Sequence, residues 1–386
     1  FQPNESTVNQ LAFMYHEFSE ALDRKKDVRI VFCDVSKAFD KVWHLGIIFK
    51  LKQLGIDGIL LDWFTDYLKN RKQRVVIKGK CSEWGTIEAG VPQGSVLGPL
   101  LFIVYINDLA DVVNCNIKMF ADDTCLYVKI DDKSQANEKT AELNRNLSSL
   151  ATWANQWLVT FNPTKTKCMT ISNKKVVYPD VCFNNTVLEN VTCHKHLGIN
   201  INNNLKWTKQ IDHILSNASR MLDVSLKLQY KLDRKSLETI YVSFIRPKLE
   251  YGCQIWDDCS IQDKDRLENF QIKAARLVTG AKKGTSHELL YNELNWEKLS
   301  DRRRNVKILF MHKIVNKLVP EYLCDLLPDK VGANVNIKTR NSGNIRQLPC
   351  KTSKFSHSIL PDCIKMWNSL DPCVRDTADL ILSRNL

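Results

Sequence analysis

Two adjacent acidic residues between strand-like segments are the most constraining feature of this sequence. Asp122 and Asp123 lie in the stretch IKMFADDTCLYV, residues 117–128. Apolar, β-favouring runs on both sides of a short polar break predict a β-hairpin with its turn at or beside the acids. Two neighbouring carboxylates repel each other, and a desolvated carboxylate needs a cation or a donor beside it. Magnesium would remove the repulsion, because it binds carboxylate oxygens together with substrate phosphates; the alternative is a solvated Asp-Asp turn.

The composition favours a globular protein with a polyanionic partner. The 386 residues are enough for two or three domains, and 44% of them are hydrophobic. The net charge is +12 and the pI about 9.0, which favours nucleic acid over a membrane as partner. No apolar run approaches the length of a membrane span, and the first residues lack the features of a signal peptide.

The cysteines predict free thiols rather than a disulfide framework. There are thirteen of them, an odd number, and no CxxC pair. This pattern is typical of a protein in a reducing compartment. Cys193, His194 and His196 form a small cluster, but no second ligand pair at zinc-finger spacing accompanies it, which disfavours zinc.

The hydrophobic periodicity predicts a mixture of helices and strands. Apolar positions at helical spacing predict a helix over residues 6–25 with Ser6 or Thr7 as its N-cap, and VRIVFCDV, residues 28–35, predicts a buried strand that reaches Asp34. The other expected elements are helices at 44–54 and 58–69, a basic strand at 71–80, a Gly/Pro-rich loop into an apolar helix within 88–113, the hairpin at 117–130, a helix at 133–157, a strand at 165–172, and mainly helical segments over 204–330. Weaker periodicity after Pro328 predicts a linker and a small terminal module.

These elements predict a ββαβ-type core in an α+β sheet domain. A strand carrying Asp34, a Gly-rich loop leading into a helix and a hairpin with two acids follow one another along the chain. Asp34 precedes Asp122 by 88 residues, so only the fold can bring the two carboxylates together.

Five stretches resemble the motifs of one protein family, in matching order. The family is the reverse transcriptases of non-LTR retrotransposons, LINE-like and of the jockey type. The stretches similar to its motifs A to E are FCDVSKAFDKV (32–42), GVPQGSVLGPLLF (90–102), FADD (120–123), WLVTFNPTKTKCM (157–169) and KHLGININNNLKW (195–207). A further run, YVSFIRPKLEYGCQIW (241–256), resembles the thumb region of jockey-like elements. The resemblance extends from Phe1 to about Leu327 and is specific, whereas FADD alone would be a weak signal.

The resemblance implies an α+β right-hand polymerase fold. We expect a palm with an antiparallel sheet, packed helices and truncated fingers, followed by a helical thumb and a small C-terminal extension. The expected limits are residues 1–200 for the fingers remnant and palm, 201–327 for the thumb or connection, and 328–386 for the extension. FQPNEST resembles only the end of the fingers region and no initiator Met is present. We therefore expect a fragment of a larger polyprotein, with its endonuclease domain elsewhere, or a degraded genomic copy.

The activity implied by the resemblance is RNA-directed DNA polymerisation. Such an enzyme extends a DNA primer on an RNA template with deoxynucleoside triphosphates. By the same resemblance Asp34, Asp122 and Asp123 hold two Mg²⁺ ions, with Mn²⁺ as an alternative, and the carbonyl of Val35 adds a ligand. Two ions about 3.5–4 Å apart stabilise the attacking hydroxyl oxygen and the oxygen of the leaving pyrophosphate.

Other matched positions receive roles from the resemblance. Phe39 is expected to exclude a 2′-hydroxyl below the sugar, and Gln93 and Gly94 to face the nucleotide and template. Lys165 is expected to protonate the leaving pyrophosphate, and Asp40 to form a structural salt bridge. The plainer alternatives are a core aromatic for Phe39, a simple turn before a helix for the loop residues, and a solvated lysine.

Leu197 and Gly198 match the primer-grip turn, against the alternative of any tight turn. Candidates for lining a channel for the RNA/DNA hybrid are Arg71, Arg74, Lys206, Trp207 and Arg246; for any one of them, a surface charge or a core aromatic is favoured over a specific contact.

Two rival functions stay open. A decayed or co-opted copy would bind RNA or RNA/DNA hybrid without synthesis, which the missing fingers favour and the intact motifs oppose. An RNA-dependent RNA polymerase is disfavoured by Phe39 and by the FADD motif. The resemblance implies an intracellular location, nuclear, cytoplasmic or both, with no membrane partner; the basic run at 302–304 is the only import-like signal found.

Overall fold

A computed structural model describes residues 3–175, 177–332 and 342–375 of the chain. Within this described part, contacts divide the chain into two compact units: a first unit over residues 26–192, and a second that joins the segment up to residue 25 to everything from residue 193 onward. Helices and strands both contribute, which confirms the expected α+β class. The expected domain limits at residues 200 and 327 stay predictions.

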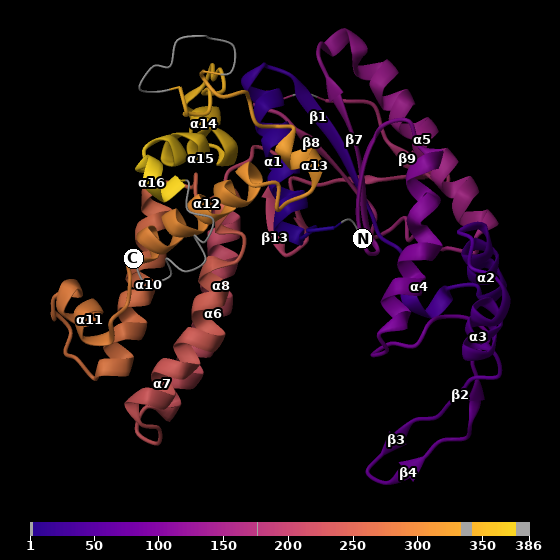
Figure 1. Ribbon diagram of the computed structural model, residues 1–386, viewed down its shortest axis with the longest axis horizontal. Coiled ribbons are helices and arrows are strands. Elements are labelled where there is room, and N and C mark those ends of the chain that lie inside the picture. The colour runs from indigo at the N-terminus through magenta and orange to yellow at the C-terminus, as the bar shows by residue number, and fades with distance from the viewer. Residues whose placement is uncertain (1–2, 176, 333–341, 376–386) are drawn as a thin grey trace. The chain divides into compact units, whose positions relative to one another are not determined.

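A five-stranded sheet is the framework of the first unit (Figure 1). Its central strand β1 (Asp27–Cys33) is buried along its whole length and runs antiparallel to both of its neighbours, β7 and β8. The other strands are β6 (Asn116–Phe120), β7 (Asp123–Ile130), β8 (Lys167–Ile171) and β11 (Glu189–Asn190), in the order β11-β8-β1-β7-β6. The predicted strand at 28–35 and the predicted hairpin at 117–130 are both confirmed.

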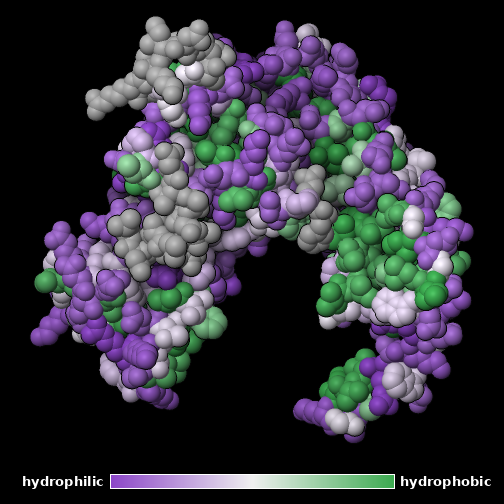
Figure 2. Space-filling model, viewed as in Figure 1, coloured by the Kyte–Doolittle hydropathy of each residue, from purple (hydrophilic) through white to green (hydrophobic). Residues whose placement is uncertain are grey.

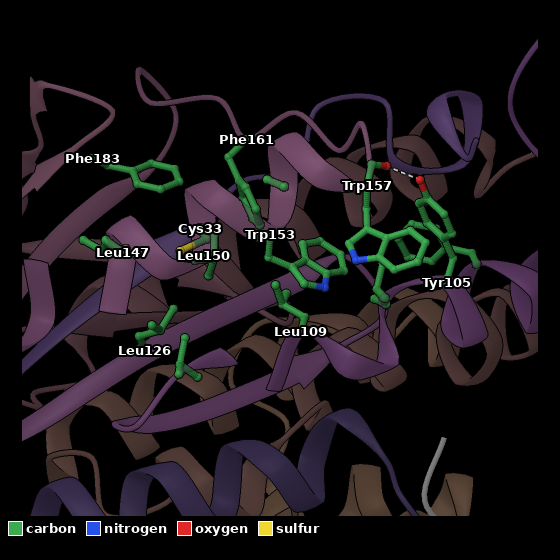
Figure 3. Close-up of a cluster of buried hydrophobic side chains, with 14 of the residues drawn as sticks. Cys33, Tyr105, Leu109, Leu126, Leu147, Leu150, Trp153, Trp157, Phe161 and Phe183 are labelled. Carbon is green, nitrogen blue, oxygen red and sulfur yellow. Dashed lines mark hydrogen bonds between the residues drawn. The ribbon is translucent and has the colours of Figure 1, made fainter. Parts of the chain in front are cut away.

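Four α-helices lie in the described part of the first unit. They are α2 (His44–Gln53), α3 (Gly58–Leu68), α4 (Leu97–Ile106) and α5 (Ala136–Gln156), all close to their predicted ranges. Short 3₁₀ segments lie at Ala38–Lys41, Asn107–Val112 and Lys133–Gln135, and a small hairpin pairs β9 (Cys182–Phe183) with β10 (Thr186–Val187). Apolar side chains of the sheet and of α5 form one buried cluster, to which Leu126, Leu147 and Leu150 belong (Figure 3).

The basic strand predicted at 71–80 is wrong as a single strand. The segment forms two short strands, β2 (Lys72–Gln73) and β3 (Val76–Ile77), which pair with β5 (Gly85–Thr86) and β4 (Lys80–Cys81). The chain reverses at Lys78 and Gly79, which both have positive φ, at 50° and 81°. A two-residue turn of this kind matches the twist of a hairpin, so the strand ends at Ile77.

Lys50, a buried lysine of α2, is surrounded by aromatic side chains. The Nζ atom of Lys50 donates hydrogen bonds of 2.5 Å to the carbonyl oxygen of Tyr105 and to a carboxylate oxygen of Asp108. It lies 3.8 Å from the ring centre of Trp157 and 4.9 Å from that of Trp153. The Tyr105 hydroxyl donates to the carbonyl of Trp157, as the dashed line in Figure 3 marks. Burial lowers the pKa of Lys50, and the contact with Asp108 offsets only part of that effect.

We expect Lys50→Ala to destabilise the first unit by about 2–4 kcal/mol, because it leaves a cavity between the rings and an unpaired buried carbonyl. Lys50→Met keeps the packed stem and loses only the ammonium contacts, so its loss should be smaller. Urea denaturation followed by tryptophan fluorescence measures both variants. Equal stability of the wild type and Lys50→Ala would show that these contacts of Lys50 contribute nothing to the fold.

The second unit is built mainly from helices, as predicted for residues 204–330. A hairpin of β12 (Cys193–His196) and β13 (Ile199–Asn202) begins its larger segment. The helices of that segment are α6 (Thr208–Leu228), α7 (Arg234–Ile240), a π-helical turn (Tyr241–Ile245), α8 (Arg246–Glu250), α9 (Cys253–Trp256), α10 (Ile261–Thr279), α11 (His287–Leu294), α12 (Leu299–Val315), α13 (Glu321–Cys324), α14 (Ser353–Ser356), α15 (Ile359–Asn368) and α16 (Pro372–Arg375).

The first helix of the chain, α1 (Thr7–Asp23), packs in the second unit although the predicted palm included it. Its expected N-cap is confirmed, because the Ser6 side chain accepts from the backbone N–H of Asn9. At its other end the buried carboxylate of Asp23 accepts hydrogen bonds from the backbone of Lys351, at 2.9 Å, and Thr352, at 2.7 Å. These bonds tie α1 to the segment before α14, which explains its place in this unit.

The cysteine prediction is confirmed as far as pairing is concerned. All thirteen cysteines lie in the described part of the chain, and none forms a disulfide. Among the described residues, no helix combines the length and apolar character that a membrane crossing requires.

Candidate active site

The two adjacent acids lie at the tip of the β6–β7 hairpin. Phe120 pairs with Asp123, so the turn consists of Ala121 and Asp122, and Ala121 has a positive φ of 52°. The hairpin predicted at this position is therefore confirmed, with its turn at the acids. On the neighbouring strand β1, Cys33 pairs with Thr124 of β7. Asp34 follows Cys33 directly, so the antiparallel register brings it to the end of β1 that adjoins the hairpin tip.

The electrostatics of Asp123 indicate that the three carboxylates lie close together. The side chain of Asp123 stays exposed at the hairpin tip, and its partial loss of hydration there raises its pKa, which the negative charges of Asp122 and Asp34 raise further. Like charges held in one place disfavour ionisation of one another. The fold thus brings Asp34 near Asp122 and Asp123, although 88 residues separate Asp34 from Asp122 in the sequence.

The backbone of Asp34 is held from the segment before β8. Its N–H donates to the hydroxyl of Thr166 at 3.3 Å, and its carbonyl accepts from the N–H of Asn162 at 2.8 Å. The Nζ atom of Lys165 lies 4.0 Å from a carboxylate oxygen of Asp34. Lys165 therefore adjoins the acids, with about two thirds of its side chain exposed. Thr166 is fully buried, and its role in positioning Asp34 was not predicted from the sequence. The only feature of the sequence that could have indicated it is the place of this threonine between Lys165 and Lys167.

The carbonyl of Val35 is oriented toward the hairpin side of β1. Val35 forms an antiparallel bridge with Phe161, and the hydrogen bonds flank this pair, donated by the N–H groups of Ser36 and Asn162 at 2.8 Å each. A residue in such a pair points its own N–H and C=O away from its partner. Phe161 lies on the β8 side, so the Val35 carbonyl faces the side of β7, where the acids are.

The donor set suits a hard divalent cation. Carboxylate oxygens and a backbone carbonyl are the ligands that Mg²⁺ prefers, and the negative charges of Asp122 and Asp34 contribute to the raised pKa of Asp123. Within the described residues no three His, Cys, Asp or Glu side chains converge closely enough to hold a metal ion by themselves. Mg²⁺ is commonly held by one or two carboxylates together with substrate phosphates rather than by an all-protein cage.

Phe39 lies on the 3₁₀ turn that follows β1, beside the Gly-rich loop. Its ring centre is 4.7 Å from that of Phe102 on α4, and its carbonyl accepts from the N–H of Val91 at 2.8 Å. The ring is only partly buried at the edge of the hydrophobic cluster. It is therefore a packed aromatic that also presents a surface near the loop.

The Gly-rich loop is attached to the same turn. The side-chain amide of Gln93 donates to the carboxylate of Asp40 at 2.8 Å, so Asp40 contacts an amide where a salt bridge was expected. Gly94 has a φ of 80° and open space where a Cβ would point, which suits close approach of a ligand. Gly90, which sequence reasoning did not single out, has a φ of 93°, and a Cβ there would lie 2.7 Å from the carbonyl oxygen of Asp40. Only glycine fits at this attachment point.

A family model described as "Reverse transcriptase (RNA-dependent DNA polymerase)" matches residues 1–201. The chain belongs to this family. It is 31% identical over 314 residues to the probable RNA-directed DNA polymerase from transposon BS of Drosophila melanogaster, covering 76% of this chain and 34% of the relative. It is 28% identical over 352 residues to the RNA-directed DNA polymerase from mobile element jockey of the same species, covering 88% and 38%. The predicted resemblance to non-LTR retrotransposon reverse transcriptases is thereby confirmed.

The chain spans about one third of the length of these relatives. Among solved structures, apo telomerase from Candida tropicalis is similar with a TM-score of 0.42 and 12% identity, covering 82% of this chain and 51% of that one.

The expected primer-grip residues of the reverse transcriptase form a tight turn in the second unit. Leu197 and Gly198 connect β12 to β13 and have positive φ of 45° and 84°. The hydroxyl of Tyr251 donates to the Leu197 carbonyl at 2.9 Å, and a Cβ on Gly198 would lie 2.9 Å from the Tyr251 ring. The turn adjoins a groove of about 830 Å³ whose lining includes Lys195 and Lys248.

One proposed channel residue is a core aromatic instead. Trp207 is buried, and its indole N–H donates to the carboxylate of Asp258. The hydroxyl of Tyr15 on α1 donates to the same carboxylate. Burial raises the pKa of Asp258 to about 6, and these two donors limit the shift. Trp207 therefore stabilises the second unit and is not free to stack on a nucleic acid.

Proposed function

We propose that this chain is the polymerase part of a non-LTR retrotransposon reverse transcriptase, which extends a DNA primer on an RNA template. The observation that carries the proposal is the meeting of Asp34 with Asp122 and Asp123, together with the raised pKa of Asp123. Catalytic carboxylates are characteristically held in such a repulsive arrangement, which a bound cation relieves. The alternative of a copy that binds without synthesis is not favoured, because it gives no reason to keep the acids together.

Asp34, Asp122, Asp123 and the carbonyl of Val35 would hold Mg²⁺, or Mn²⁺ in its place. When bound, such ions stabilise the attacking hydroxyl oxygen and the charge on the leaving pyrophosphate. Lys165 would deliver a proton to the pyrophosphate, and its position 4.0 Å from Asp34 supports that role. Gln93 and Gly94 would face the nucleotide and template.

The two compact units support an assignment of polymerase subdomains. The sheet of the first unit would serve as the palm, the helices that follow the β12–β13 hairpin as the thumb, and the segment after residue 328 as a small extension. Leu197 and Gly198 would contact the primer. An endonuclease domain would lie elsewhere in the full polyprotein, and the protein would act inside the cell, in the nucleus, the cytoplasm or both.

Primer extension tests this function directly. Purified protein is mixed with an RNA template, an annealed DNA primer, Mg²⁺ and deoxynucleotides, and products are resolved by length. We expect template-directed extension that chelation of the metal abolishes. Binding of the primer–template without extension, even at high Mg²⁺ and Mn²⁺, would contradict the proposal.

Phe39→Ala is expected to increase ribonucleotide incorporation relative to deoxynucleotide incorporation by about tenfold or more, because it removes the ring that would collide with a 2′-hydroxyl. Single-nucleotide incorporation rates with each nucleotide measure this ratio. Since the ring also packs on Phe102, Phe39→Val is a second variant that keeps more of that contact. Phe49→Ala, at an exposed aromatic on α2, is the matched control. An unchanged ratio in both Phe39 variants would show that Phe39 is an ordinary core aromatic.

A further inference from the structure

Residues 69–86 form a protruding hairpin that we call the arm. Every residue from 72 to 86 is exposed, including Val75, Val76, Ile77 and Trp84, at 57–65%. Figure 1 shows the β2–β5 strands extending away from the helices of their unit, and Figure 2 shows a hydrophobic patch on the arm. An isolated two-stranded hairpin is marginally stable in water. Because none of these residues is buried, the hairpin contributes little to the core. Its exposed apolar side chains therefore indicate a surface that binds a partner.

The charge of the arm favours a polyanion as that partner. Residues 69–86 contain six basic side chains and one acidic side chain, Glu83, a net charge of +5 out of +12 for the whole chain. The basic residues are Lys69, Arg71, Lys72, Arg74, Lys78 and Lys80. Eighteen of 386 residues thus carry a large share of the excess positive charge, on a surface that water reaches from all sides.

Flat groups follow one another along α3 and into the arm. Trp63 and Tyr67 stack with ring centres 5.6 Å apart and planes 12° apart, and the guanidinium of Arg71 lies 5.7 Å from the ring centre of Tyr67. Further out, the guanidinium of Arg74 lies 4.6 Å from the ring centre of Trp84. Tyr67 is partly buried against the core, whereas Trp63 and Trp84 are exposed. Accessible rings and guanidinium planes interleaved with basic side chains are the combination that holds single-stranded nucleic acid, whose unstacked bases lie on the flat groups.

The arm is directly connected to the proposed nucleotide site. It is inserted between α3 and the Gly-rich loop, and its base closes where the N–H of Ile87 donates to the carbonyl of Arg71 at 2.9 Å. Three residues later, Gly90 donates to the carbonyl of Val42 at 2.8 Å and anchors the loop that carries Gln93. A strand held on the arm is therefore held by the same segment that leads to the loop.

We propose that the arm, together with Trp63 and Tyr67, binds single-stranded template RNA. The choice of RNA as the strand rests on the proposed function, whereas the affinity for a single strand rests on the charge and stacking groups of the arm. A protein partner or an anionic membrane would have to satisfy the same basic residues, but neither requires aromatic rings paired with guanidinium planes along a track.

The test is equilibrium binding of the full chain to a fluorescein-labelled oligouridylate of about 20 nucleotides, followed by anisotropy at several salt concentrations. One variant replaces residues 73–85 with the dipeptide Asn-Gly. Lys72 and Thr86 are paired across the β2–β5 ladder, so a two-residue turn can join them directly. We expect its affinity to fall about tenfold or more, with a flatter salt dependence, because about three phosphate contacts are lost. Arg74→Ala combined with Trp84→Ala should lose at least about fivefold.

Arg145→Ala is the matched control, since Arg145 is an exposed arginine on α5 of the same unit. It should bind as the wild type does. Unchanged affinity of both arm variants would overturn the proposal, as would a loss confined to an oligothymidylate of equal length or to vesicles containing anionic lipid. The measurement involves no synthesis, so a chain that binds through the arm but fails to extend a primer contradicts the proposed function and leaves this inference standing.

Discussion

Asp122→Asn and Asp123→Asn are each expected to lower nucleotide incorporation by at least about 10³-fold while leaving the fold intact. Asparagine has nearly the shape of aspartate but lacks the charge that holds a divalent cation. Single-turnover primer extension measures the loss. Near-wild-type incorporation by either variant would contradict the assignment of these acids as metal ligands.

The stability of Asp123→Asn distinguishes a functional defect from a folding defect. The pKa of Asp123 is raised in the folded state by lost hydration and by the neighbouring acids. A folded-state pKa above the unfolded value means that this group favours folding at low pH, and that this contribution is lost as the pH rises through the folded pKa. Because Asp123 is exposed and solvent screens its charge, the cost in stability at neutral pH is small, so the asparagine variant should melt at the same temperature as the wild type or slightly above it. The difference should vanish below a pH of about 4.

Added Mg²⁺ provides a readout that does not depend on synthesis. An ion that binds only the folded chain raises its melting temperature. We expect this increase for the wild type and a smaller one for Asp122→Asn and Asp123→Asn. In the same assays Lys165→Ala should slow incorporation by about 10²-fold and keep the increase in melting temperature with Mg²⁺, because a general acid acts on the leaving group and is not a ligand of the ion. Lys133→Ala, at an exposed lysine before α5, is its control.

The site could be anticipated from sequence where the signals are local. The hairpin around Asp122 follows from strand-like residues on both sides of a polar break, and the strand before Asp34 from a short apolar run. Their meeting depends on the pairing of β1 with β7, a contact between segments far apart in the chain. No local pattern encodes that register, so it was the matched motifs that indicated the triad.

Contacts between distant segments account for what the sequence did not indicate. Thr166 positions Asp34, and Gly90 lies against Asp40, yet both look ordinary beside their own neighbours in the chain. The same holds for α1, whose helical pattern was clear but whose place in the second unit depends on Asp23 and a segment more than 300 residues away. Periodicity shows which face of a helix is buried and not what covers it.

A buried ion cluster in the second unit gives the largest stability effect that we expect. Asp257, at the end of α9, accepts from the guanidinium of Arg303 at 2.7 Å and from the ammonium of Lys307, and Lys264 lies 3.6 Å away. Lys307 also reaches Asp362 on α15 at 2.7 Å. The side chains of Arg303 and Lys307 are only 3% and 5% exposed. The cluster thus links α9, α10, α12 and α15 around largely buried charges, and Arg303 belongs to the basic run 302–304.

Asp257→Asn should destabilise the second unit by about 3–5 kcal/mol, because it removes the carboxylate charge beside buried Arg303 and leaves Lys307 to Asp362. Asp212→Asn is the matched control: it removes a 2.6 Å contact to Arg266 between two half-exposed side chains and should cost less than about 1 kcal/mol. Urea denaturation measures both losses. Equal losses in the two variants would show that burial adds nothing to this cluster.

The pH dependence of that loss follows from the two shifted groups. Burial alone would raise the pKa of Asp257, but the charges of Lys307, Lys264 and Arg303 outweigh it and hold the pKa below its ordinary value. Burial alone would lower the pKa of Lys307, but Asp257 and Asp362 raise it above its ordinary value. The stability contributed by the Asp257 carboxylate is therefore present above a pH of about 4 and is lost as the pH falls through its folded pKa. The stability contributed by the Lys307 ammonium is present below a pH of about 10 and is lost as the pH rises through its folded pKa. The difference in unfolding free energy between the wild type and Asp257→Asn should form a plateau between these limits and shrink on acidification, whereas a loss caused by altered packing alone would stay constant with pH.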